Sequence, residues 1–237
     1  MSEWAAKRFW TAASAEEVEG GHAVRLDGRA VKTPAKAALV VPSRAMAEAI
    51  AEEWQAQDER IDPRTMPVTR GANAAIDRVR PQHGEVADML AAYGDSDLLC
   101  YRADAPAELV ERQEAAWDPL LDWAAEACGA RLAPRTGVMH EGQDPAALER
   151  LRTEVHALDA FALAAFHDLV SLTGSLVLGL AAERKAFDPE ALWAASRIDE
   201  IWQQELWGED EDALAAAEAK RLAYLDAVRF LSLTRSA

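Results

Sequence analysis

The sequence predicts an α+β fold, in which a mostly antiparallel β region with flanking helices is followed by an all-helical C-terminal domain. Over the first 42 residues, apolar side chains recur with the period of about two that is typical of strands. After Pro42 the period lengthens to about 3.6, which is typical of helices. Asp-Pro pairs and glycines then divide the rest of the chain into segments of helix length. We therefore expect an N-terminal α+β domain over residues 1–143 and a helical domain over residues 144–237.

Four short segments near the N-terminus have strand-like sequences, at residues 7–11, 22–26, 29–33 and 37–41. The second and third flank Asp27 and Gly28, a dipeptide that readily adopts the positive φ angles of a tight hairpin turn. Pro42 ends the fourth segment, and the aromatic residues Phe9 and Trp10 favour a strand in the first. We expect these segments to form one small sheet.

The first helix is expected directly after this sheet. Ser43 is a suitable N-cap, and Met46, Ile50 and Trp54 then fall on one helical face. After a Pro-containing loop, two short helices and two weak strands are expected at residues 70–79, 82–93, 97–102 and 131–138. Gly94 is expected to end the second of these helices in a left-handed conformation.

Three Asp-Pro pairs are each expected to start a helix, beginning at Asp118, Asp144 and Asp188. The Asp carboxylate accepts hydrogen bonds from the free N–H groups of the first turn, where Pro loses no bond of its own. Gly129 and Gly208 are suitable stops. The helices expected from these signals cover residues 107–128 with a break near Pro119, 145–158, 160–182, 189–207 and 210–231.

Composition limits the classes of partner. The formal net charge is -16, so phosphate backbones and anionic lipid repel the chain, which argues against nucleic-acid binding and electrostatic membrane docking. The most apolar stretch, residues 169–182, is shorter than the about 20 residues of a membrane span and is expected to be a buried core helix. The first ten residues resemble no secretory or transit signal, and the two cysteines lack CxxC spacing. We expect a soluble cytoplasmic protein.

No residue pattern is typical of catalysis. The sequence contains neither GxxxxGK[ST] nor GxGxxG, and Ser175 lies in a predicted apolar helix outside any GxSxG elbow. His156 and His167 would lie about 16 Å apart on one continuous helix, too far to share a metal ion. Cys100 falls in a predicted strand, where a thiol is usually buried and inert. We assign no catalytic residue, metal ligand or cofactor.

Tryptophan is the unusual residue of this chain, with eight copies where about one per hundred residues is ordinary. Core packing is the ordinary role, and we expect it for most of them. Residues 196–212 (SRIDEIWQQELWGEDED) are different, because Trp207 there stands beside an acidic corner from Glu209 to Asp212. An apolar anchor within a polar rim is typical of a protein interface. This segment is therefore the strongest candidate for a partner-binding surface.

Five segments, in their order and spacing, resemble the ATP12 family of assembly chaperones, from about residue 8 to about residue 225. They are residues 26–34 (LDGRAVKTP), 41–54, 97–102 (DLLCYR), 117–124 (WDPLLDWA) and 196–208 (SRIDEIWQQELWG). The resemblance implies an N-terminal, mostly β region joined to a helical C-terminal domain. It also implies a function without catalysis, in which the chain holds the unassembled alpha subunit of the F-type ATP synthase soluble until that subunit pairs with beta.

The resemblance and the patterns above assign roles to individual residues. Partner binding is expected at Asp199, Glu200, Gln203, Glu205 and Trp207, with the first two exposed. Structural roles are expected for Trp54, Trp117, Asp118, Pro119 and Gly208. The expected partner is the ATP synthase alpha subunit as a transient client of a monomeric chain, with no nucleic acid, membrane insertion or cofactor. Two alternatives stay open: an enzyme or small-molecule-binding protein with the same fold, and a stable accessory subunit of a complex.

Overall fold

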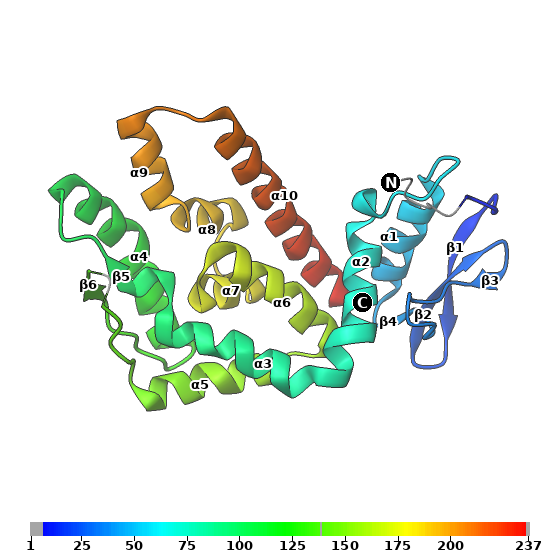
Figure 1. Cartoon of the computed structure of the whole chain (residues 1–237). Coiled ribbons are helices and arrows are strands. Elements are labelled where there is room, and N and C mark those ends of the chain that lie inside the picture. Colours follow the sequence, from blue (N-terminus) through cyan, green and yellow to red (C-terminus); the bar gives the residue numbers. More distant parts are fainter. Residues whose placement is uncertain (1–6, 138, 236–237) are drawn as a thin grey trace. The chain divides into compact units, whose positions relative to one another are not determined.

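The computed structural model describes residues 7–137 and 139–235, and its α+β class agrees with the prediction (Figure 1). The chain forms two compact units, and neither is continuous in sequence. Of the described residues, the N-terminal unit comprises 7–82, 160–165 and 229–235, and the helical unit comprises 83–137, 139–159 and 166–228. The domain border expected between residues 143 and 144 stays a prediction.

The N-terminal unit contains a four-stranded antiparallel sheet, with strands β1 (Ala13–Val18), β2 (Gly21–Leu26), β3 (Arg29–Ala30) and β4 (Val40–Val41). Strand β2 pairs with each of the other three strands. The predicted hairpin is confirmed: Asp27 and Gly28 adopt φ angles of 46° and 80°, and Leu26 lies opposite Arg29. The short polar turn therefore sets the register of β2 and β3.

The strand expected at residues 7–11 is wrong, since Lys7 makes only an isolated bridge to Arg60. The Trp10 side chain is buried instead, edge-to-face with Trp54 at 5.2 Å between ring centroids. The first strand is β1, whose sequence ASAEEV has too little apolar alternation to be recognised. It pairs with β2 along its whole length, so its position is decided by the strand beside it.

Helix α1 (Arg44–Gln55) starts where predicted, because the Ser43 hydroxyl accepts a hydrogen bond from the Met46 N–H at 3.0 Å. Helix α2 (Pro67–Ala74) starts three residues before the predicted position. The Glu53 carboxylate of α1 accepts the N–H groups of Val68 and Thr69, each at 2.7 Å, and so caps α2 from a neighbouring helix. A π-helical turn (Ala75–Val79) and a short 3-10 turn (Arg80–Gln82) continue α2.

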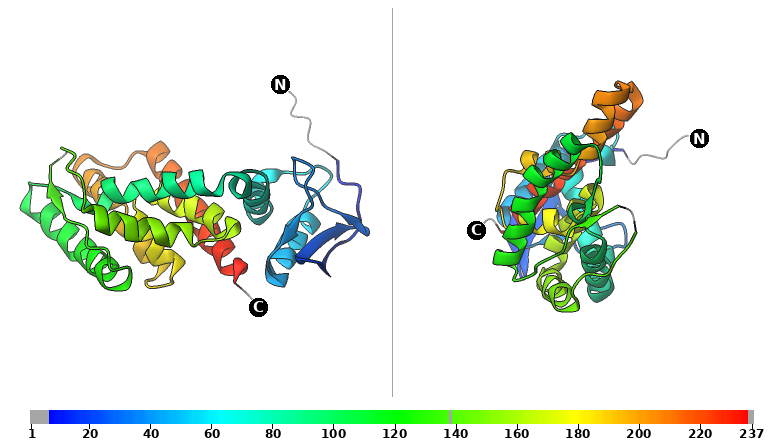
Figure 2. Two further views of the ribbon diagram at one scale, coloured as in Figure 1. Left: turned by 90° about the horizontal axis from the view of Figure 1, so that it is seen from below. Right: turned by 90° about the vertical axis from the view of Figure 1, so that its left-hand side faces the viewer.

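Eight further helices follow: α3 (His83–Ala91), α4 (Ala107–Ala127), α5 (Pro145–His156), α6 (Ala160–Thr173), α7 (Leu176–Glu183), α8 (Pro189–Ala195), α9 (Ile198–Trp207) and α10 (Glu211–Thr234). Helices α6 and α10 contribute residues to both units. Asp144 and Asp188 cap α5 and α8 as predicted, each accepting a backbone N–H at 3.1 Å. Figure 1 and the right-hand view of Figure 2 show α9 and the first turns of α10, in orange, at the edge of the helical unit.

Asp118 and Pro119 do not start a helix, which corrects the prediction. Helix α4 runs unbroken through Pro119, and Asp118 lies inside it. Proline removes the donor that the carbonyl of Ala115 would use, but Ala115 is exposed and water can hydrate that carbonyl. Asp118 instead accepts a hydrogen bond from Arg102 Nη2 at 2.8 Å.

Two helices predicted as continuous are each interrupted. The segment 160–182 divides at Gly174, which adopts a φ of 72°, and Ser175 then caps α7 by accepting the Leu178 N–H at 3.0 Å. The sequence predicted that Ser175 lies inside a helix. It is instead the buried N-cap of α7. The segment 189–207 divides at Ser196 and Arg197 into α8 and α9.

The region between α3 and α4 differs from the prediction at Gly94, which has no left-handed φ and lies in a 3-10 turn (Ala92–Ser96). A Cβ there would meet three leucine side chains at 3.2–3.3 Å, so close packing explains the glycine. The expected strands shorten to β5 (Tyr101–Arg102) and β6 (Arg135–Thr136), paired in parallel. The last residue of the expected strand, Val138, lies outside the described residues.

The core of the helical unit contains the apolar stretch 169–182, as predicted. Phe166, Leu169 and Val170 of α6 are fully buried, and so is every residue of α7. Gly179 brings the two helices together, since a Cβ there would lie 2.7 Å from the Val170 side chain. None of the helices in the described part of the chain has the length and apolar character of a membrane span.

Candidate functional site

Helix α9 forms most of the segment that the sequence singled out, and it is poorly buried. It contains no fully buried residue, and three of its large apolar side chains are exposed. Ile201 is 40% exposed, Leu206 59% and Trp207 86%. Gly208 ends the helix with a φ of 91°, and the acidic residues 209–212 lead into the first turn of α10, which begins at Glu211. An indole at this exposure is costly in water, so α9 presents an unsatisfied apolar surface.

Polar contacts hold α9 against α4. Gln113 Nε2 donates to Asp199 Oδ1 at 2.7 Å, and its Oε1 accepts the Ala103 N–H at 2.8 Å. Arg112 pairs with Glu205 at 2.8 Å, and its guanidinium lies 4.9 Å from the Trp202 ring centroid. The Arg112 hydrogen bond lowers the pKa of Glu205, whose carboxylate therefore stays ionised. We call the pairs Gln113–Asp199 and Arg112–Glu205 the α9 latch.

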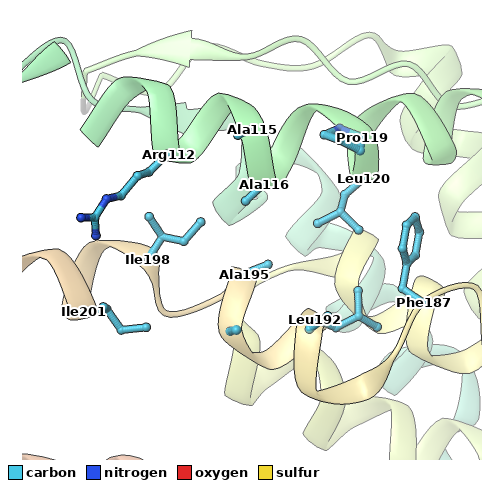
Figure 3. A pocket seen from close by; sticks show the side chains of 12 residues that line it. Arg112, Ala115, Ala116, Pro119, Leu120, Phe187, Leu192, Ala195, Ile198 and Ile201 are labelled. Atoms are coloured by element: carbon cyan, nitrogen blue, oxygen red, sulfur yellow. The ribbon is translucent and has the colours of Figure 1, made fainter. Parts of the chain in front are cut away.

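An apolar groove of about 630 Å³ lies between α4, α8 and α9. Figure 3 shows Arg112, Ala115 and Pro119 of α4 on one side and Ile198 and Ile201 of α9 on the other. On the α4 side, the small residues Ala115, Ala116 and Pro119 line the groove between Arg112 and Leu120. We call this space the α4–α9 groove.

The lining of the groove is almost entirely apolar. Of the residues that line it, Arg112 alone is charged, and Glu205 already neutralises it. A catalytic pocket needs convergent polar groups such as an acid, a base or a nucleophile, and the lining supplies none. In the described part of the chain, no three His, Cys, Asp or Glu side chains are grouped closely enough to hold a metal ion. The groove is suited to apolar side chains.

Comparison with known proteins agrees with the resemblance. Residues 7–125, half of the chain, match the sequence model of the family described as ATP12 chaperone protein. The chain belongs to the ATP12 family. It is therefore a member of a family of chaperones.

Solved structures extend the match to nearly the whole chain. Atp12 from Paracoccus denitrificans is 53% identical with a TM-score of 0.95, over 98% of this chain and 100% of that one. The Atu1473 protein of Agrobacterium tumefaciens is 42% identical with a TM-score of 0.92, over 97% of this chain and 86% of that one. Protein atp12, mitochondrial, of Schizosaccharomyces pombe is 26% identical over 219 residues, 87% of this chain and 75% of that protein.

Three of the segments that carry the ATP12 resemblance meet at α4. Arg102 of the DLLCYR segment pairs with Asp118 and stacks on Trp117, its Cζ 5.2 Å from the ring centroid. Trp117 is fully buried and donates its indole N–H to the Ala195 carbonyl at 2.8 Å, just before the α9 segment. Trp117 therefore joins α4 to the end of α8, and Asp118 joins α4 to Arg102 of β5.

The five predicted partner-binding residues divide into two groups. Gln203, Glu205 and Trp207 are exposed, and their role in partner binding stays a prediction. Asp199 and Glu200 were expected to be exposed and are half-buried: Asp199 belongs to the α9 latch, and Glu200 pairs with Arg197 at 2.9 Å. Sequence periodicity assigned Asp199 to the wrong face because it could not reveal that α4 packs there.

The other residues weighed in the sequence are not brought into the groove. Trp54 is half-buried against Trp10, and none of the described residues bonds its indole N–H. His156 bonds Asp88 at 2.6 Å, whereas His167 bonds Asp168, which raises the pKa of His167. The two histidines therefore have separate partners.

Both cysteines are buried and unbridged. Burial raises the pKa of the Cys100 thiol to about 12 and also raises that of Cys128. A thiolate is the reactive form of cysteine, so both thiols are inert near neutral pH, as predicted for Cys100.

Sequence reasoning missed the groove itself. Ala115, Ala116 and Pro119 look like ordinary positions of an Ala-rich helix, and Phe187 follows α7 in a short connection. The available signal was the absence of a large apolar residue at these three α4 positions, on a helix that is otherwise rich in Leu and Trp. That signal is weak until the facing helices are known.

Proposed function

We propose that this chain is an assembly chaperone for the F-type ATP synthase, which binds the unassembled alpha subunit and prevents its aggregation until it pairs with beta. Membership in the ATP12 chaperone family supports the chaperone role. The observation that carries the binding site is α9, whose Ile198 and Ile201 line the apolar groove and whose last residue, Trp207, is 86% exposed. Exposed aromatic side chains of this kind are the usual anchors of protein interfaces.

The proposed client surface consists of Gln203, Glu205, Leu206 and Trp207, together with the α4–α9 groove. An unassembled subunit exposes apolar patches that promote aggregation, and the apolar part of this surface can cover one. Polar groups around a few apolar anchors suit a complex that a second subunit must displace. We propose release by beta, with no nucleotide, cofactor or catalysis.

The remaining partner assignments belong to the same proposal. The net charge of -16 disfavours nucleic acid and anionic membranes as partners. We propose a monomeric cytoplasmic chain whose client is transient. A stable accessory subunit would instead co-purify with the finished ATP synthase, which separates that alternative from transient chaperoning.

The test combines a pull-down with light scattering. Purified alpha subunit should form a soluble complex with the wild-type chain and scatter less light in its presence. Trp207→Ala should weaken the complex about tenfold or more, since hot-spot residues contribute about 2 kcal/mol or more. Leu222→Ala is the matched control, because Leu222 is also exposed (51%) but lies on α10 away from the groove lining. No complex with the wild-type chain would refute the proposed function.

A further inference from the structure

The chemistry of the α4–α9 groove and its surroundings defines the kind of client segment that fits there. Resting on the proposed function, we propose that the groove binds a short apolar segment of the client that is flanked by Lys or Arg side chains. The groove selects the apolar part, and the acidic residues 209–212, which follow α9 and lead into the first turn of α10, select the basic part.

The size and lining of the groove define the apolar part. A volume of about 630 Å³ is in the range of pockets that hold one small ligand, so the groove admits a few side chains and not a folded domain. The small side chains of Ala115, Ala116 and Ala191 leave room for the side chains of a bound segment. Leu120, Phe187 and Ile198 supply apolar contact area. A polar side chain placed there would lose its hydration without gaining a partner, whereas an apolar one would gain about 25 cal/mol for each Å² buried.

The charges along α9 define the basic part. Glu205 lies one turn beyond Ile201, and Trp207 lies about 9 Å beyond it along the helix axis. The acidic corner from Glu209 to Asp212 follows directly. In the described chain, no Lys, Arg or His forms an ion pair with Glu209, Glu211 or Asp212. A client cation placed there would meet carboxylates that are not already neutralised.

Other occupants of the groove fit less well. A second copy of this chain would bring another charge of -16 to an acidic surface, which is unfavourable. A polar small molecule would find only Arg112, whose charge Glu205 already balances. The lone Arg112–Glu205 pair at one end leaves the rest of the lining without a polar group for orienting such a ligand.

The first test fills the groove. The double variant Ala116→Leu/Ala191→Leu adds two isobutyl groups to its walls, and Ala215→Leu on the exposed face of α10 is the matched control. In a pull-down with purified alpha subunit, we expect at least tenfold weaker binding for the filled variant and less than twofold change for the control. Circular dichroism and thermal unfolding check that both variants stay folded.

The outcomes separate the two proposals. If the wild-type chain does not bind the alpha subunit, the proposed function fails, and the groove assignment fails with it. If the wild-type chain and the filled, folded variant bind equally, the groove assignment alone is wrong.

The second test identifies the occupant. Ala115→Cys, labelled with benzophenone maleimide, places a photo-crosslinker in the groove, since the inert native thiols of Cys100 and Cys128 leave the new cysteine as the reactive one. Ala215→Cys is the matched control. We expect the alpha-subunit peptides captured from the groove to combine an apolar run with Lys or Arg within a few residues, and capture to weaken as salt is added.

Three results of the crosslinking would overturn the proposal. Captured peptides with no excess of basic residues would refute the charge selection. Equal capture by the control site would show that the groove has no preference. Crosslinks between two copies of this chain would assign the groove to self-association.

Discussion

Helices α7 and α9 are both short, and both begin after a break in a longer predicted helix, yet their burial is opposite. All eight residues of α7 are buried, whereas none of the ten residues of α9 is. Each has an Asp carboxylate near its start, Asp97 at α7 and Asp199 at α9. Asp97 is fully buried and accepts backbone N–H groups of Leu99 and Val177, both at 3.0 Å.

The comparison separates stability from binding. Helix α7 contributes buried apolar area, and the Asp97 carboxylate beside it accepts a backbone N–H of its first turn. Helix α9 contains no buried residue, is held through polar contacts, and leaves Ile201, Leu206 and Trp207 exposed. We expect substitutions in α7 to act on the free energy of unfolding and substitutions at the end of α9 to act on client binding. The following predictions test this division, in order of decreasing effect on the free energy of unfolding.

The largest effect is expected in α7, from Leu178→Ala. Leu178 is fully buried, so its removal loses transfer energy and leaves a cavity. Urea unfolding should show a loss of about 2–5 kcal/mol. The matched variant Leu206→Ala in α9, at a leucine that is 59% exposed, should lose less than about 1 kcal/mol. Equal losses at the two positions would contradict the division.

The next effect concerns pH and Asp97. Burial raises the pKa of this carboxyl from its ordinary value of 3.8 to about 6. Between those pH values the folded chain holds the proton more tightly than the unfolded chain does, so the contribution of Asp97 to stability is full below pH 3.8 and is lost as the pH rises through 6. The loss amounts to about 1–3 kcal/mol.

Asp97→Asn isolates this titration, because an amide does not titrate. We expect the stability of the wild-type chain relative to Asp97→Asn to fall between pH 4.5 and pH 7 in urea unfolding. A difference that is constant with pH would show that the buried carboxyl does not titrate in this range. Asp88 and Glu205 have lowered pKa values, so the stability they contribute is lost on acidification. Both chains carry these groups, so their contribution cancels in the difference between the wild-type chain and Asp97→Asn.

A smaller effect is expected at the α9 latch. Gln113→Ala leaves the Asp199 carboxylate and the Ala103 N–H without their partner, which should cost about 1–2 kcal/mol. Amide hydrogen exchange should become faster in α9 and stay unchanged in α7. Gln203→Ala is the control, because Gln203 is exposed on the same helix. Unchanged exchange in α9 would mean that Arg112 and Glu205 hold the helix without Gln113.

The smallest effect on stability is expected for Trp207→Ala. The indole is 86% exposed, so the free energy of unfolding should change by less than about 0.5 kcal/mol, although the same variant should weaken the proposed client complex. Thermal unfolding and the pull-down measure the two effects on one sample. A destabilisation above about 1 kcal/mol would mean that Trp207 supports the fold and is no binding anchor.

Signals that act within a few residues predicted the structure well. Asp27 and Gly28 form the hairpin, and Ser43, Asp144 and Asp188 cap the helices that follow them. These residues act on backbone groups one to three positions away, so nothing distant has to be known. Trp207 belongs to the same class, since it stands directly before the Gly208 stop and the acidic run 209–212, where few neighbours along the chain can cover it.

Signals that depend on distant partners failed. Pro119 was expected to break α4, but the helix continues because the freed carbonyl faces solvent. Gly94 was expected to end a helix in a left-handed conformation. It is instead a position where leucines of α5 and α7 leave little room for a Cβ. Asp199 was assigned to an exposed face because Gln113, 86 positions earlier in the sequence, was not known to lie beside it.

The sequence by itself determined the fold class, the family resemblance and the segment that includes α9, because periodicity, caps and motif order are properties of the chain. The tertiary structure decided where α7 begins, which face Asp199 occupies and that a groove exists between α4, α8 and α9. A groove is made by residues that fail to fill the space between helices. No single segment of sequence records that space, since it depends on which surfaces face each other after folding.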